Sequence, residues 1–77
     1  MLTDNDRTVI QSRLGLSGRE VQVVEGILND KTERAVAREL GISPHTVHEH
    51  LRRIFRKGNV HSRAALCVMV MCALFEE

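Results

Sequence analysis

Seventy-seven residues are enough for one small core, and a domain of this size buries only about 60% of the surface that its unfolded chain exposes. Hydrophobic residues make up 43% of the chain and only two residues are aromatic, which excludes an extensively disordered chain and predicts an aliphatic core. The net charge of +1 excludes a uniformly basic protein, so any affinity for a polyanion must come from a local patch.

The sequence predicts a soluble cytoplasmic protein with no membrane partner. No charged-plus-apolar signal pattern opens the chain, and the longest apolar run, from Ala64 to Phe75, falls short of the ~20 residues needed to span a bilayer. Cys67 and Cys72 lie five residues apart in one predicted helix, so their side chains point in different directions and cannot pair inside it. We expect buried, reduced thiols, which fit a reducing cytosol.

Apolar residues recur at helical spacing along the whole chain, with no internal repeat, low-complexity tract or linker. This pattern predicts one all-α domain over residues 16–77, preceded by an arm or short helix over residues 1–15. Within the arm, the segment Asp4 to Arg13 has a weak helical pattern with Val9 and Ile10 as its apolar pair. We expect at most a short, frayed extra helix there.

The first well-defined helix is expected to begin at Ser17. Glu20 follows three residues later, which is the spacing of a capping box, and Leu16 can pack on Val21 across that cap. The buried face of this helix is expected to comprise Val21, Val24, Ile27 and Leu28.

Two further helices follow, joined by a tight turn. Thr32 is a good N-cap for a helix over residues 33–40, and Gly41 provides the left-handed residue that ends it. Ser43 caps the next helix, which is expected over residues 43–57. The inner face of the first helix is expected to comprise Val36, Ala37 and Leu40, and that of the second Val47, Leu51, Ile54 and Phe55.

The last predicted helix, over residues 62–76 with Ser62 as its cap, is apolar almost all round. A helix without a polar face must be covered on two sides, and a chain this short has material to cover only one. A second copy of the same helix across a two-fold axis is the economical solution, which predicts a homodimer. A helix wedged into the monomer core, or left poorly covered in a fragment, is the alternative. The expected interface residues are Val68, Met71, Cys72 and Phe75.

Residues 33–52 also match the residue pattern of a helix-turn-helix. Ala37 stands where a larger side chain would push two helices apart, and Gly41 stands where the turn needs a positive φ. The remaining core positions of the pattern are filled by Val36, Leu40, Ile42 and Val47. This agreement predicts that the second helix of the pair is presented to the major groove of DNA.

Positive charge is concentrated on that second helix. From Ser43 to Arg63 there are five basic residues and one acid, and all four histidines lie in the same stretch, whereas the rest of the chain is net acidic. With the apolar residues turned inward, the opposite face displays guanidinium and imidazole groups. We expect a local positive patch that suits phosphate binding, with a merely solvated basic face as the alternative.

Three residues near the front half of this face are the candidates for contacts to base edges: His48, Glu49 and Arg52. Arg52 can make a two-donor contact to guanine, Glu49 can accept from a cytosine amino group, and His48 can contact a purine edge. Other residues are better placed for the phosphate backbone, which sets register without reading sequence. This second group comprises Thr32, His45, Thr46, Arg53, Arg56 and Lys57.

The sequence predicts no metal site, no cofactor and no enzyme active site. His45 and His48 are one helical turn apart, but no carboxylate or thiol completes a recognisable metal-ligand spacing. His50, three residues after Val47, lies at the edge of the core and is expected to pack and hydrogen-bond. No nucleophile and base arrangement, Gly-rich phosphate loop or paired-carboxylate motif occurs in the chain.

Together, three segments resemble the LuxR/GerE-type helix-turn-helix of bacterial transcription regulators, from Leu16 to about Leu74. They read L-S-G-R-E-V-Q-V-V, D-K-T-E-R-A-V-A-R-E-L-G-I-S-P-H-T-V-H-E-H and I-F-R-K-G-N-V-H-S-R. The resemblance implies a four-helix domain whose third helix, here Ser43 to Lys57, enters the major groove of double-stranded DNA. It also implies that the fourth helix, here Ser62 to Phe75, pairs two domains across a two-fold axis.

The chain departs from the family pattern at three positions. His48 stands where relatives usually have Lys or Arg, and Glu49 where small or apolar residues are common, so base preference does not transfer. Gly58 replaces the usual Leu after the Lys of the exit motif, which predicts weaker packing of that turn. Many relatives carry a receiver or small-molecule-sensing domain ahead of this module. None is in this chain, which we expect to be either a stand-alone regulator or a fragment.

Two other functions stay open at the level of sequence. A sigma-factor region 4 domain uses a similar hairpin and contacts promoter DNA as part of RNA polymerase, which makes the polymerase a further candidate partner, although the apolar last helix argues against this assignment. A protein-interaction or dimerisation module that kept the fold and lost DNA binding is the other alternative, with Glu49 and the low net charge in its favour.

Overall fold

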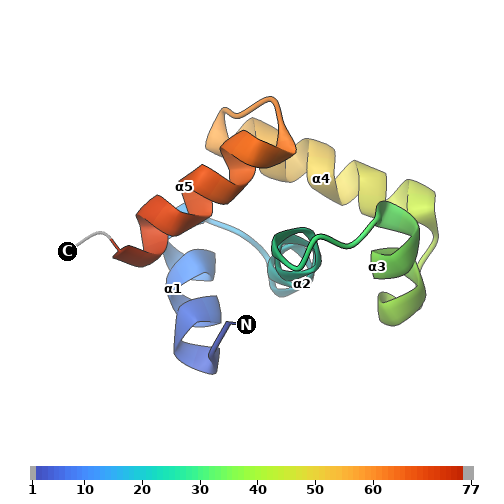
Figure 1. Cartoon of the computed structure of the whole chain (residues 1–77), viewed down its shortest axis with the longest axis horizontal. Helices are drawn as coiled ribbons and strands as arrows, with labels where there is room; N and C mark the ends of the chain where they lie inside the picture. The colour runs from blue at the N-terminus through green and yellow to red at the C-terminus, as the bar shows by residue number, and fades with distance from the viewer. Residues whose placement is uncertain (1, 76–77) are drawn as a thin grey trace.

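The computed structural model describes residues 2–75, and in that range the chain forms five α-helices and no strand (Figure 1). The helices are α1 (Asp4–Leu14), α2 (Gly18–Leu28), α3 (Glu33–Leu40), α4 (Pro44–Gly58) and α5 (Arg63–Phe75). In Figure 1, α2 is seen nearly end-on near the centre, α1 and α3 flank it, and α4 and α5 run above it. The predicted all-α fold is confirmed. The expected end of the last helix, at residue 76, lies outside the described residues.

Capping residues set the helix ends, as the sequence predicted. Ser17 Oγ accepts from the backbone N–H of Glu20 at 3.1 Å, and the Glu20 carboxylate accepts from the backbone N–H of Ser17 at 2.8 Å, which completes a capping box. The hydroxyls of Thr32, Ser43 and Ser62 each accept from the N–H three residues on, at 3.0 to 3.1 Å. Each cap satisfies a donor that the first helical turn leaves unpaired.

The N-terminal arm is a complete, capped helix rather than the frayed segment that its sequence suggested. Thr3 and Asp6 form a second capping box, which the sequence analysis missed. Ile10 is fully buried, and the Arg13 guanidinium donates to the Ala73 carbonyl oxygen of α5 at 2.6 Å. α1 therefore packs on α5 and α2 as part of the same core.

One aliphatic core joins all five helices. α2 contacts α1, α3 and α4, and its Val23 and Val24 are fully buried. Val23 was not among the residues expected to be buried, whereas Leu28, Leu40 and Phe55 are only half-buried. Because α2 is covered on several sides, its buried surface is wider than one helical stripe. The other buried apolar residues are Ile10, Leu16, Val21, Ile27, Val36, Ala37, Val47, Leu51, Ile54, Leu66, Val70 and Ala73.

Two glycines permit close contacts between helices. A Cβ at Gly26 of α2 would lie 2.5 Å from Val36 Cγ2, so glycine lets α2 and α3 approach each other. A Cβ at Gly58 would overlap the Met69 thioether of α5, so the Met69 side chain already fills that space. The turn after α4 is packed by α5, and the weaker packing expected at Gly58 is not what the structure shows. Asn59, with φ 53°, supplies the left-handed residue that ends α4.

Three further side chains differ from their predicted surroundings. Cys67 is half-buried and Cys72 is exposed, so neither is the fully buried thiol that was expected, although both are unpaired as predicted. Cys72 is exposed because it lies on the side of α5 away from the buried Leu66 and Val70. His50 is half-buried, and among the described residues its buried Nδ1 has no hydrogen-bond partner, so the bond expected of this side chain is missing at that atom.

Within residues 2–75, no single helix has the length and apolarity needed to cross a membrane. By length and composition alone, α4 and α5 taken as one pair bent by 58° pass the same test.

Candidate nucleic-acid interface

α3 and α4 form a helix-turn-helix hairpin. Gly41 ends α3 with a φ of 69°, and the N–H of Ile42 donates to the Ala37 carbonyl oxygen at 3.0 Å. Ala37 is buried, which allows the two helices to pack closely. Ser43 Oγ then caps α4 by accepting from the N–H of Thr46 at 3.1 Å. The hairpin therefore holds one side of α4 against the core and leaves the other side free.

The free side of α4 carries most of the predicted contact residues. Val47, Leu51 and Ile54 are buried, and at 3.6 residues per turn the opposite side belongs to a different set of residues. This set, which we call the α4 outer face, comprises His45, His48, Glu49, Arg52, Arg53 and Arg56. Five of the six are exposed, and Glu49 is half-buried. The structure thus brings guanidinium and imidazole groups together on one solvent-facing surface.

The three predicted base-contacting residues make weak contacts within the protein. His48 Nδ1 lies 3.3 Å from Glu33 Oε1 of α3, a pair that is ionic only when the imidazole is protonated. Arg52 Nη1 lies 3.4 Å from Glu49 Oε1. Exposed pairs of this kind contribute about 0–1 kcal/mol. They orient the side chains in the free protein and are easily exchanged for other partners.

The predicted phosphate-contacting residues occupy different surroundings. The Thr32 hydroxyl accepts from the first turn of α3, and Thr46 Oγ1 lies 2.9 Å from Ser43 Oγ, so both threonines sit at helix caps. Three other exposed members have side chains that make no hydrogen bond or ion pair with any described residue. These unpaired residues are His45, Arg53 and Arg56.

Lys57 is bound into the fold. Its Nζ lies 2.7 Å from Glu20 Oε1 and 3.1 Å from the Gly15 carbonyl oxygen. Glu20 is buried, which by itself raises the pKa of its carboxyl, but hydrogen bonds from Lys57 and from the backbone N–H of Ser17 outweigh burial and hold the pKa below its ordinary value. The pair ties the end of α4 to the start of α2. Glu20 and Lys57 are 37 positions apart in the chain, and helical spacing cannot predict a contact over that distance.

Two exposed arginines of the hairpin were not among the predicted site residues. Arg34 and Arg38 lie one turn apart on α3, and neither side chain makes a hydrogen bond or ion pair within residues 2–75. Helical spacing places both arginines opposite Val36 and Leu40. They were overlooked in the sequence analysis because the residues outside 43–63 carry a net negative charge. They add two cations to the same hairpin.

α5 exposes apolar side chains on the side that faces away from the core. Leu66 and Val70 are buried, whereas Val68, Met71 and Phe75 are 63%, 50% and 73% exposed. Cys72 is exposed with them. We call this group the α5 outer face, and it comprises the four residues that the sequence assigned to a dimer interface: Val68, Met71, Cys72 and Phe75. Their part in an interface stays a prediction.

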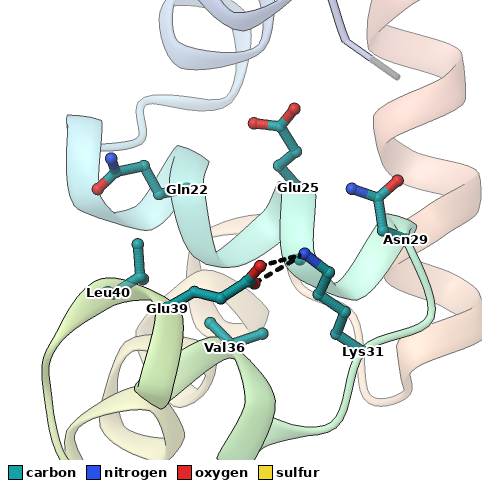
Figure 2. Close-up of a pocket in the computed structure, with 8 residues that line it drawn as sticks. Gln22, Glu25, Asn29, Lys31, Val36, Glu39 and Leu40 are labelled. Atoms are coloured by element: carbon teal, nitrogen blue, oxygen red, sulfur yellow. Dashed lines mark hydrogen bonds and ion pairs between the residues drawn. The ribbon is translucent and has the colours of Figure 1, made fainter.

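A groove of about 280 Å³ lies between α2 and α3 (Figure 2). Figure 2 shows Lys31 reaching across it to Glu39, with Nζ 2.6 and 2.7 Å from the two carboxylate oxygens. Glu25 also lines the groove, but two hydrogen bonds from the Arg7 guanidinium, each 2.9 Å, hold its pKa below the ordinary value. With both carboxylates paired, the groove offers no free charge to a ligand. The described residues contain no group of three or more His, Cys, Asp or Glu that could hold a metal ion.

Residues 14–70 match the GerE family, described as bacterial regulatory proteins of the luxR family. The chain belongs to the LuxR family. The resemblance identified from the sequence is confirmed, and the helix-turn-helix hairpin of α3 and α4 lies wholly inside the matched segment. The LuxR family comprises DNA-binding regulators of transcription and is not a family of enzymes.

Three relatives illustrate the match. A nitrate/nitrite response regulator protein homolog from Haemophilus influenzae is 41% identical over 54 residues, which cover 70% of this chain and 26% of that protein. The transcriptional regulatory protein FixJ from Azorhizobium caulinodans is 34% identical over 71 residues, covering 91% of this chain and 34% of FixJ. The spore germination protein GerE from Bacillus subtilis is 36% identical over 61 residues, covering 79% of this chain and 82% of GerE.

The chain therefore spans about a quarter to a third of the length of the first two of these LuxR-family relatives, and most of the length of GerE. No solved structure matches the chain.

Proposed function

We propose that this LuxR-family chain binds double-stranded DNA sequence-specifically, with α4 in the major groove, and so regulates transcription. The observation that carries the proposal is the α4 outer face, where three arginines and two histidines are exposed on a helix whose opposite side is buried. A recognition helix needs this division, because only exposed side chains can reach base edges while the buried side fixes the helix. FixJ, with which the chain shares 34% identity, is named a transcriptional regulatory protein.

Base contacts are assigned to His48, Glu49 and Arg52. Arg52 donates two hydrogen bonds to guanine, and Glu49, 3.4 Å from it, accepts from a cytosine amino group. Opening the exposed Arg52 and Glu49 pair costs about 0–1 kcal/mol, whereas a good bidentate base contact is worth about 1–3 kcal/mol of discrimination. The exchange therefore favours the cognate base. His48 contacts a purine edge after leaving Glu33.

Phosphate contacts are assigned to the exposed groups around that centre. Arg53, Arg56 and His45 have no partner in the described chain, so they are available to backbone oxygens. The Thr32 hydroxyl can donate to phosphate while its oxygen keeps accepting from the N–H of Ala35. The Thr46 hydroxyl can donate to phosphate when the Ser43 hydroxyl is the donor between the two side chains, which lie 2.9 Å apart. These contacts position the helix and carry most of the salt dependence. Lys57 is left out of the set because its ammonium is bound to Glu20.

Pairing of the α5 outer face with the same face of a second copy is the second part of the proposal. Residues 68, 71, 72 and 75 follow the spacing of one helical stripe, and a contiguous exposed apolar patch is typical of an interface. Two-fold symmetry lets one stripe pack against its own copy. The pair would present two α4 helices to half-sites about one DNA turn, ~10 bp, apart.

Fluorescence anisotropy with duplexes selected from a random pool tests the DNA-binding part. We expect the affinity of the wild type to fall steeply with salt, because phosphate contacts release counterions. Arg52→Ala should weaken the selected site by about 1–3 kcal/mol and unrelated duplexes far less, whereas the matched variant Arg53→Ala should weaken all duplexes similarly. Equal losses on all duplexes for Arg52→Ala would remove it from the base-contacting set. Absence of wild-type binding would favour the interaction-module hypothesis.

Sedimentation tests the dimer. Met71→Glu places a charge in the α5 outer face and should lower the observed mass to that of one chain, with an unchanged circular dichroism spectrum, because Met71 is half exposed. Gln22→Glu adds the same charge at an exposed position of α2 and should leave the mass unchanged. A wild type that sediments as one chain at high concentration would refute the dimer.

A further inference from the structure

The carboxyl end of α4 and the loop that leads to α5 border a shallow, open hollow next to the α4 outer face. Its volume is about 380 Å³, and it is largely open to solvent. We call it the C-terminal hollow, and its lining residues are Arg52, Phe55, Arg56, Asn59, Val60 and His61. From the sequence, Asn59, Val60 and His61 were given no role, and Phe55 was given only a position in the core.

The lining combines an apolar wall with hydrogen-bond donors. Phe55 and Val60 are half-buried, so part of their apolar surface faces the hollow. The side chains of Arg56 and His61 are exposed, and neither side chain makes a hydrogen bond or ion pair with another described residue. No acidic side chain lines the hollow. This combination suits a ligand that is anionic at one end and apolar at the other.

The backbone of the loop fixes these groups in place. The N–H of Asn59 donates to the Arg56 carbonyl oxygen at 3.2 Å, and the N–H of Val60 donates to the Phe55 carbonyl oxygen at 3.0 Å. These bonds pair two of the carbonyl oxygens at the negative end of α4, which lessens their repulsion of an anion without removing it. They also hold the loop before any ligand arrives, so less conformational freedom is lost on binding.

We propose that the C-terminal hollow binds one sugar-phosphate unit of the DNA backbone, at the edge of the site contacted by α4. The Arg56 guanidinium and a ring N–H of His61 donate to the phosphate oxygens, and the deoxyribose lies against Phe55 and Val60. This inference rests on the proposed DNA binding by α4. It adds His61 and the loop between α4 and α5 to the interface.

The DNA backbone is favoured over a free phosphorylated molecule by the position of the hollow. Arg52 lines the hollow and also belongs to the α4 outer face, so the two surfaces are continuous. A helix that crosses the major groove brings its carboxyl end close to one of the phosphate strands, as in other helix-turn-helix variants. A free nucleotide would use the same donors, and the experiment below separates the two sources.

The test measures duplexes in which each phosphate in turn is replaced by an uncharged methylphosphonate. Arg56→Gln should lower affinity about five-fold at about 0.15 M salt, which is the loss expected for one phosphate contact. At one position, the methylphosphonate should weaken the wild type by the same factor and weaken Arg56→Gln no further. His61→Ala should lose roughly two- to ten-fold and identify the same phosphate.

Arg38→Gln is the matched control, because it removes the same charge from α3, outside the hollow. The loss of affinity caused by Arg38→Gln should add to the loss caused by the methylphosphonate at the position that Arg56→Gln identifies. Circular dichroism melting of each variant checks that the fold is retained. Additive losses for Arg56→Gln and His61→Ala at every phosphate would overturn the inference and leave DNA binding by α4 intact.

Two further outcomes distinguish the causes of failure. A wild type that binds no duplex would overturn the proposed function, and this inference with it. In an NMR titration with deoxyadenosine monophosphate, shifts of the amides of residues 55–61 at concentrations that do not displace DNA would overturn the inference in favour of a small-molecule site.

Discussion

α4 and α5 bury similar aliphatic stripes and expose opposite chemistry. The inner residues are Val47, Leu51 and Ile54 in α4, and Leu66, Val70 and Ala73 in α5. The α4 outer face carries arginine, histidine and glutamate, whereas the α5 outer face carries valine, methionine, cysteine and phenylalanine. The buried stripes determine where each helix lies, and the exposed faces determine what it can contact. One face suits a polyanion and the other an apolar surface.

Side-chain charge alone does not assign a residue to the outer face of α4. Lys57 and Arg53 are both cations of this helix, yet the Lys57 ammonium is bound to the buried Glu20 and Arg53 has no partner in the described chain. The difference arises from helical position, because Lys57 faces the start of α2. One cation stabilises the fold, and the other is free for a partner.

The largest effect on stability is expected when a buried residue of α5 is substituted and compared with an exposed one. Leu66→Ala should lower the free energy of unfolding by about 2–5 kcal/mol, because it leaves a cavity in the core. Val68→Ala removes a largely exposed side chain and should change the monomer by less than about 0.5 kcal/mol. Urea unfolding at low protein concentration measures both. Equal losses would mean that the two sides of α5 do not differ in burial as described.

The next largest effect is expected from a comparison of Lys57 with Arg53, both cations of α4. Lys57→Met leaves the buried Glu20 carboxylate without its charged partner and should lower the free energy of unfolding by roughly 1–3 kcal/mol. Arg53→Met should change it by less than about 0.5 kcal/mol, while weakening DNA binding. Urea unfolding and anisotropy, measured on both variants, separate the roles. A stable Lys57→Met variant would return Lys57 to the candidate phosphate contacts.

A pH profile gives a smaller, related effect. The pKa of Glu20 is lower in the fold than its ordinary value of 4.5, so its ionised form stabilises the fold above about pH 4.5, and that contribution is lost as pH falls through the lowered pKa. Protonated Glu20 can still accept from Ser17, which limits the loss. Thermal melting from pH 7 to pH 3 should therefore show a steeper decline for the wild type than for Glu20→Gln. Parallel profiles would argue against the Glu20 and Lys57 pair.

The smallest effect is expected at Thr32, which caps α3 and is also a proposed phosphate contact. Thr32→Ala should lower the free energy of unfolding by about 1 kcal/mol through loss of the cap. Thr32→Asp keeps a good capping residue and should retain stability, but its negative charge should weaken DNA binding. Melting and anisotropy test the two roles separately. Unchanged DNA affinity in Thr32→Asp would exclude Thr32 from the interface.

Local sequence signals were sufficient for most of the fold. The caps at Ser17, Thr32 and Ser43 act within three residues, and helical periodicity identified the inner stripe of α4. α1 was underestimated because its stability depends on distant contacts. Its Ile10 is buried among the other helices, and Arg13 bonds to a carbonyl of α5 sixty residues away in sequence.

The site was predictable to the same extent and for the same reason. Periodicity identified the residues that share the α4 outer face, because it depends on one helix alone. It could not identify the pairing of Lys57 with Glu20 or the Met69 side chain over Gly58, since both depend on how two helices cross. Cys72 was expected to be buried from its residue type, but its position on α5 places it among exposed residues.

NMR titration of the ¹⁵N-labelled chain with a selected duplex tests the role of α4 most directly. We expect the largest amide shifts in residues 45–61, on the α4 outer face and around the C-terminal hollow, and smaller shifts in residues 68–75 of α5. Largest shifts on the α5 outer face, or none at saturating DNA, would contradict the assignment of α4 as the DNA-binding helix.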